Sequence, residues 1–132
     1  MGSFSDYLEL ELLDHVFGAA AYTAPVTLYA AAYTATPSDS GGGTEVSGTN
    51  YSRVAITNNA TNFPAASGGA KSNGTAITFP TAGGSWGTVT AIGLLDASSG
   101  GNLIAWDDFT GVAITTNDVL EVAIGDLDIT LD

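Results

Sequence analysis

One short motif in the sequence has the spacing of a catalytic site, at residues 83–87. Gly83, Ser85 and Gly87 match the G-x-S-x-G pattern, in which a serine on a strained strand-to-helix turn attacks a carbonyl with the help of a histidine. The residues after Ser85 alternate as in a strand, and the one histidine, His15, falls in a separate N-terminal segment. The motif therefore predicts a glycine-rich turn and no catalytic residue.

Metal ligands are the second kind of chemistry to consider. His15 has neither a second histidine nor a cysteine with which to share a metal. It is expected near a helix C-terminus, a place that is favourable for a histidine when it is protonated. Asp107, Asp108, Asp126 and Asp128 carry the oxygen ligands that Ca²⁺ prefers, but they lack the spacing of a calcium-binding loop. We therefore expect solvated carboxylates, no metal and no cofactor.

The two tryptophans, Trp86 and Trp106, allow two interpretations. Each lies in an apolar, strand-like segment, which favours a role as a core anchor. A tryptophan ring is also a platform on which a sugar can stack, so a saccharide-binding role stays open as the alternative.

Charge and composition exclude several classes of function. Fourteen acidic and two basic residues give a formal charge of −12, which repels nucleic-acid phosphates and anionic lipid surfaces. Cysteine is absent, which excludes disulfides and thiolate metal sites. The start of the chain does not resemble a signal peptide and no apolar run has membrane-spanning length, so we expect a protein made in a cytoplasm, away from membranes.

The elements that must position these residues are mostly strands. Residues 77–109 contain the clearest hairpin, with alternation over 85–95, a glycine-containing turn at 97–101 and a second strand over 102–106. A long exposed loop is expected at 35–50, which has almost no apolar content. Further strand-like segments lie at residues 26–34, 51–57, 75–79, 111–116, 119–124 and 126–132.

Residues 3–17 are expected to form a helix, with Ser3 and Ser5 as candidate N-caps and Gly18 after its end. Its apolar side chains form two stripes, one of Phe4, Leu8, Leu12 and Val16 and one of Tyr7, Leu10, Leu13 and Phe17. Such a helix either lies deep in its own domain or wedges against a neighbouring subunit, and the sequence leaves both open. In the second case the interface candidates are Phe4, Tyr7, Leu8, Leu12, Val16 and Phe17.

These elements predict a mainly β protein with one N-terminal α-helix. About seven or eight short strands at this spacing are typical of an antiparallel β-sandwich or a partly closed barrel. We divide the chain into an N-terminal helix, residues 1–18, acting as an arm or clamp, and a single β domain, residues 19–132.

Four segments together resemble a family of small virion proteins of tailed bacteriophages, labelled tail-fibre-like or head-decoration proteins. The similar segments are residues 3–18, 21–31, 51–106 and 127–132. The resemblance implies a structural role in the particle, and the family has no established catalytic residues to carry over.

Small size, the two-sided helix and this resemblance favour a capsid decoration or cement protein over an enzyme. We expect a homo-oligomer, with a trimer favoured, made in the bacterial host cytoplasm and bound to the major capsid protein or another virion protein on the outer surface of the head. The alternative is a tail-fibre or receptor-binding module whose Trp86, Trp106 or loop 35–50 faces a host glycan. An unrelated carbohydrate-binding domain is the third interpretation.

Overall fold

The computed structural model describes residues 2–131 as one helix and ten strands. The helix is α1 (Asp6–Val16), and the strands are β1 (Gly2–Phe4), β2 (Thr27–Ala35), β3 (Thr44–Glu45), β4 (Val54–Thr57), β5 (Ala70–Ser72), β6 (Ile77–Thr78), β7 (Gly87–Leu95), β8 (Leu103–Ile114), β9 (Glu121–Val122) and β10 (Asp128–Thr130). Eight strands form one sheet in the order β3-β2-β7-β8-β1-β10-β5, with β4 also paired to β2, and β6 and β9 form a second, small sheet. The predicted mainly β fold with one helix is confirmed, with a higher strand count because several strands have only two or three residues.

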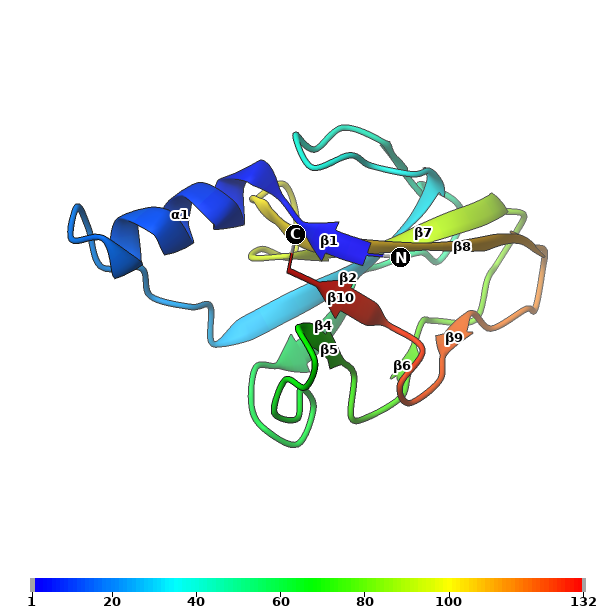
Figure 1. Ribbon diagram of the computed structural model, residues 1–132. Coiled ribbons are helices and arrows are strands. Elements are labelled where there is room, and N and C mark those ends of the chain that lie inside the picture. Colours follow the sequence, from blue (N-terminus) through cyan, green and yellow to red (C-terminus); the bar gives the residue numbers. More distant parts are fainter. Residues whose placement is uncertain (1, 132) are drawn as a thin grey trace.

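The predicted hairpin is the centre of the large sheet (Figure 1). β7 and β8 pair antiparallel, and the carboxylate of Asp96 closes their turn by accepting hydrogen bonds from the backbone and side-chain N–H groups of Asn102 at 2.7 and 2.9 Å. β8 runs on to Ile114 because a register shift in mid-strand keeps it paired with β7. The separate strand expected at 111–116 is therefore largely the end of β8.

The first strand, β1, was not predicted. It lies between β8 and β10, antiparallel to β8 and parallel to β10. A Cβ on Gly2 would collide with the backbone oxygens of Trp106 and Asp128, so glycine fits this slot because it has no side chain. Residues 2–4 thus belong to the sheet and not to the helix, and the sheet is mixed where a purely antiparallel one was expected. The division of the chain at residue 18 stays a prediction.

Helix α1 begins after Ser5, one of the two predicted caps, whose hydroxyl accepts a hydrogen bond from the N–H of Leu8 at 3.2 Å. It ends with Phe17 as C-cap, and Gly18 takes the left-handed φ of 85° common after a helix. Figure 1 shows the helix projecting beyond the sheet, and Leu8 is its one buried residue. Within residues 2–131, no helix is long and apolar enough to cross a bilayer.

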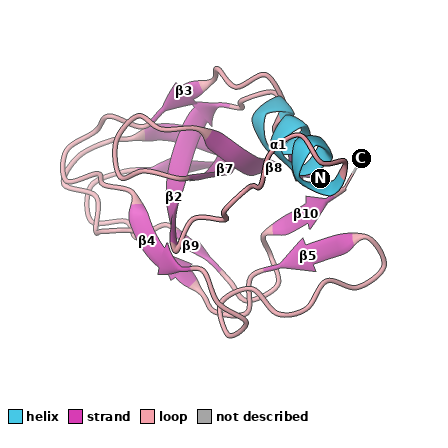
Figure 2. Ribbon diagram, turned by 90° about the vertical axis from the view of Figure 1, so that its left-hand side faces the viewer, coloured by secondary structure: helices cyan, strands magenta, loops and turns pink. Residues whose placement is uncertain are grey.

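The large sheet buries side chains on both faces. On one face the small sheet covers β7, so that the two layers form a sandwich-like arrangement, and Figures 1 and 2 place β9 below β7. This main core joins, among others, Ile77, Phe79, Val89, Ile92 and Leu120. The large sheet has two free ends, β3 and β5, and therefore does not close into a barrel. A smaller cluster on β2 and β7 contains Ala31, Tyr33, Ala91 and Leu95.

Candidate functional site

An arginine holds three segments of the chain together at one end of the sheet. Arg53 donates from Nε and Nη2 to both carboxylate oxygens of Glu45 at 2.8 Å, and from Nη1 to the carbonyl oxygens of Ala97 at 2.6 Å and Gly100 at 2.9 Å. The Arg53 side chain is only 8% exposed, and its hydrogen bonds lower the pKa of Glu45 and raise its own pKa. This ion pair fixes β3 and the β7–β8 turn relative to the start of β4.

The same network continues into the core through Tyr51. Its hydroxyl donates to Glu45 at 2.8 Å and accepts from the N–H of Ala32 at 2.9 Å, and burial raises the pKa of Tyr51 strongly. The Tyr51 ring stacks on Phe79, with centroids 6.3 Å apart, and meets Trp86 edge-on at 5.3 Å. Trp86 is therefore a core anchor, which is the interpretation that its apolar surroundings in the sequence favoured over a sugar-stacking platform.

Loop 36–43 is fastened in a similar way by Asp39. Its carboxylate accepts hydrogen bonds from the hydroxyl of Ser3 at 2.6 Å and from the indole N–H of Trp106 at 3.1 Å, and its carbonyl oxygen accepts from the N–H of Asp6 at 2.8 Å. The Ser5 hydroxyl donates to the carbonyl oxygen of Leu103. The helix start, this loop and the β7–β8 turn therefore converge.

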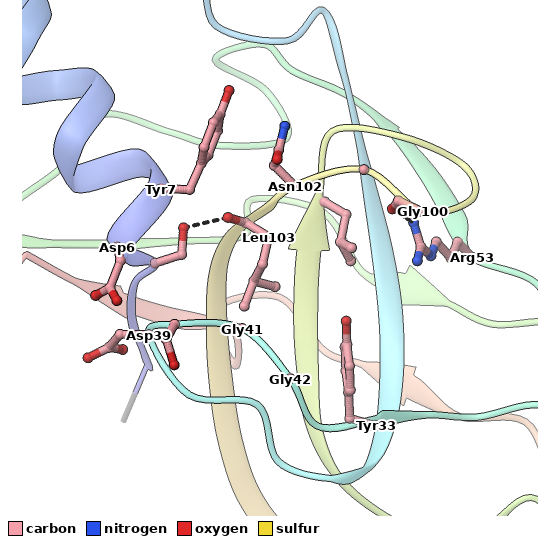
Figure 3. Close-up of a pocket in the computed structure, with 14 residues that line it drawn as sticks. Asp6, Tyr7, Tyr33, Asp39, Gly41, Gly42, Arg53, Gly100, Asn102 and Leu103 are labelled. Atoms are coloured by element: carbon pink, nitrogen blue, oxygen red, sulfur yellow. Dashed lines mark hydrogen bonds between the residues drawn. The ribbon is translucent and has the colours of Figure 1, made fainter.

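Between these three segments lies a hollow of about 470 Å³, which we call the polar hollow (Figure 3). Tyr33 of β2 lies at its inner wall, with the ring over Gly93. The residues around it are Ser5, Asp6, Tyr7, Tyr33, Asp39, Ser40, Gly41, Gly42, Arg53, Leu95, Gly100, Gly101, Asn102 and Leu103.

A second surface, along the C-terminal half of α1, is apolar. We call it the helix groove, and its apolar residues are Phe4, Leu12, Leu13, Val16, Phe17 and Leu131. Its volume is about 360 Å³, and Phe4 and Leu131 also line a neighbouring apolar hollow of about 320 Å³. Val16 is 65% exposed and Phe17 is 79% exposed. Contiguous exposed apolar surface of this kind marks interaction sites.

The structure divides the six predicted interface residues among three places. Leu8 is buried in the protein's own core, and Tyr7 lines the polar hollow. The helix groove contains the other four, Phe4, Leu12, Val16 and Phe17. Their role as an interface stays a prediction, and the groove shows which of them a partner could reach.

The residues of the serine motif are not arranged for catalysis. Ser85 is exposed, its hydroxyl accepts a hydrogen bond from the N–H of Gly87 at 3.3 Å, and β7 follows it directly, as predicted. His15 lies at the end of α1, where its Nδ1 accepts a hydrogen bond from the N–H of Tyr22 at 3.0 Å.

The aspartates considered as metal ligands differ in their exposure. Asp107 is 7% exposed, accepts a hydrogen bond from the N–H of Asp128 at 2.7 Å, and has its pKa raised by burial. Asp126 and Asp128 are exposed on either side of the buried Leu127, so the alternation read from the last segment is present. Among residues 2–131, no three His, Cys, Asp or Glu side chains are grouped as a metal site.

Sequence reasoning did not single out Tyr33, Asp39 or Arg53 as site residues. Arg53 carried a signal, because it is one of only two basic residues in the chain and lies in a strand-like segment. An isolated arginine there predicts a buried carboxylate partner. Asp39 and Tyr33 gave no comparable signal, since their partners and surroundings come from segments far away in the sequence.

The fold and these two surfaces define a small, mainly β structural module with an exposed apolar groove and a polar hollow. The family model described as "Podophage GP4 fiber I protein gp80" matches residues 3–130, so this chain belongs to that family. A search of curated proteins gave no match. The family relation confirms the resemblance to phage virion proteins and makes the chain a structural component of a bacteriophage particle.

Proposed function

We propose that the chain is a fibre-type component of a bacteriophage virion, attached to another virion protein through the helix groove. The observation that supports the fibre assignment is the family match, which spans nearly the whole chain and carries that description. The helix groove supports the attachment, since it exposes Leu13, Val16, Phe17 and Leu131. Covering such a surface contributes roughly 25 cal/mol per Å² of apolar area.

Charge favours a different protein as the occupant of the groove. Glu9 lines the groove, α1 also carries Asp6, Glu11 and Asp14, and the whole chain has a formal charge of −12. Two copies packed groove to groove would bring like charges together, whereas a partner with an apolar ridge and basic flanks would match. The predicted homo-trimer stays a proposal, in which copies of the chain contact one another outside the groove. Sedimentation of the purified protein measures its oligomeric state.

Capsid decoration is the second candidate, because an exposed apolar helix also suits a clamp across a seam between capsid subunits. Electron cryomicroscopy of particles with and without this protein distinguishes the two. Difference density in projecting fibres supports the first proposal, and density repeated over the flat head lattice supports the second.

The attachment itself is tested by a pair of variants added back to particles that lack the protein. Val16→Asp with Phe17→Asp places charges in the groove and should abolish binding to the particles. Leu10→Asp is the matched control, because Leu10 is 64% exposed on the same helix but does not line the groove. Equal binding by both variants would contradict the docking role.

A further inference from the structure

The polar hollow contains a buried side chain whose only polar atom has no hydrogen-bond partner in the described part of the chain. Tyr33 is 6% exposed, and residues 2–131 supply no hydrogen bond to its hydroxyl. Every fully buried side-chain polar atom of residues 2–131 has a hydrogen-bond partner. The unpaired Tyr33 oxygen is therefore not fully buried, and it is accessible from the hollow that the residue lines. An unpaired, nearly buried hydroxyl facing an open hollow points to a ligand.

The position of Tyr33 is built into the sheet. A Cβ on Gly93 would come within 2.8 Å of the Tyr33 ring, so glycine at this point of β7 leaves the room that the ring occupies. Figure 3 shows the ring rising from β2 with the hydroxyl at its far end, in the direction of Gly100. The hydroxyl is therefore held in place before any ligand arrives.

Of the three charged side chains that line the hollow, Asp6, Asp39 and Arg53, the last two are engaged within the protein. Arg53 is paired with Glu45, and Asp39 accepts from Ser3 and Trp106. Because these partners hold both side chains in position, little conformational entropy is lost when a ligand binds.

Besides the carboxylate of Asp6, the hollow offers a ligand a mixture of neutral donors and acceptors. The hydroxyls of Tyr33, Tyr7 and Ser40 and the amide of Asn102 line it, together with glycine-rich backbone. Ligand hydroxyl groups, which donate and accept at once, match such a mixture. Anions are disfavoured by the charge of −12, and the volume of about 470 Å³ falls in the roughly 300–1,000 Å³ range of small-molecule sites.

We propose that the polar hollow binds a neutral saccharide, with the Tyr33 hydroxyl as the hydrogen-bonding group at its inner wall. This site is independent of the proposed attachment, because Val16 and Phe17 of the helix groove do not line it.

The two tryptophans provide a local reporter and an internal reference for this site. The indole N–H of Trp106 donates to Asp39 beside the hollow, whereas that of Trp86 donates to the carbonyl oxygen of Thr49 in the core. We would titrate the ¹⁵N-labelled protein with methyl glycosides of glucose, galactose, mannose and N-acetylglucosamine to about 50 mM, well above a millimolar Kd. At least one sugar should shift the Trp106 indole resonance and leave that of Trp86 in place.

Tyr33→Phe removes only the hydroxyl and should weaken the binding of that sugar about three- to tenfold. Tyr29→Phe is the control, since Tyr29 lies on the same strand outside the hollow, and it should leave the Kd unchanged. The Val16→Asp, Phe17→Asp variant should also bind the sugar normally, which separates this proposal from the attachment.

Two results would overturn the saccharide site: no indole shift with any of the four sugars, or equal shifts of both indoles. An unchanged Kd in Tyr33→Phe, with its other resonances as in the original protein, would also do so.

Discussion

The helix groove and the polar hollow lie at opposite ends of one short helix and are built in opposite ways. Ser5, Asp6 and Tyr7 at the helix start take part in a hollow whose walls are fastened by hydrogen bonds from three loops. Val16 and Phe17 at the helix end have large exposed apolar surfaces. Directional hydrogen bonds hold a shape and suit a small ligand, whereas non-directional apolar contact tolerates adjustment and suits another protein.

The largest effect is expected from removing the ion pair beside the hollow. Arg53→Met would leave Glu45 partly buried without its cation and the carbonyl oxygens of Ala97 and Gly100 without their donor. We expect a loss of about 3 kcal/mol in the free energy of unfolding, measured by urea denaturation. Lys71→Met is the control, because it removes the other basic residue from an edge strand and should change stability by less than about 0.5 kcal/mol. Similar losses in both variants would mean that net charge, not the ion pair, stabilises this end.

The next effect separates the two sides of the helix. Leu8→Ala removes the buried anchor of α1 and should lower the free energy of unfolding by about 2–3 kcal/mol. Leu10→Ala, on an exposed position of the same helix, should change it by less than about 0.5 kcal/mol. Thermal denaturation followed by circular dichroism measures both. A Leu8→Ala protein as stable as Leu10→Ala would show that the helix is not held by the core.

A smaller effect should appear in the dependence of stability on pH. The folded-state pKa of Glu45 is lowered chiefly by its hydrogen bonds from Arg53, so its contribution is present above the unfolded pKa and is lost as the pH falls through the folded one. Asp107 acts in the other direction, because burial raises its folded-state pKa. Its contribution to stability is lost as the pH rises from its unfolded pKa through its folded pKa. Glu45→Gln should therefore flatten the decline in urea midpoint below about pH 4.5, the region of the Glu reference pKa. An equally steep decline in Glu45→Gln would assign the acid sensitivity to other carboxylates.

The smallest change in stability is expected in the helix groove. Phe17→Ser replaces a side chain that is 79% exposed and should change the free energy of unfolding by less than about 0.5 kcal/mol, while weakening attachment to the particle. Calorimetry gives the first quantity and sedimentation with particles gives the second. A strongly destabilised Phe17→Ser would mean that the groove is part of the fold and not a docking face.

Local periodicity explains what the sequence predicted well. The hairpin around residues 96–102, the helix with its Ser5 cap, and the alternation of buried Leu127 and Ile129 with exposed Asp126 and Asp128 all depend on neighbours within a few residues. Strand β1 was missed because Gly2–Phe4 is held by partners at residues 105–106 and 129–130, which local pattern does not encode.

The candidate sites were predicted less well for the same reason. Four of the six proposed interface residues do line one apolar groove. Leu12 and Val16 share a helical stripe that is readable from the sequence, whereas Phe4 lines the groove from β1. The polar hollow depends on Arg53 reaching Ala97 and on Asp39 reaching Trp106, contacts that span 44 and 67 positions of the chain. Contacts between residues so far apart in the sequence follow from the topology of the fold, and no periodic pattern in the sequence predicts them.

The placement of β1 between β8 and β10 has a consequence for how the molecule is made. Gly2 and Ser3 are synthesised more than a hundred residues before their neighbours in the sheet, which are Trp106, Ile129 and Thr130. Strand β1 stays unpaired while more than a hundred residues are added, and it then pairs with two strands that are synthesised much later. Completion of this sheet is thus a late step in folding, because pairings between residues so far apart in the sequence form slowly.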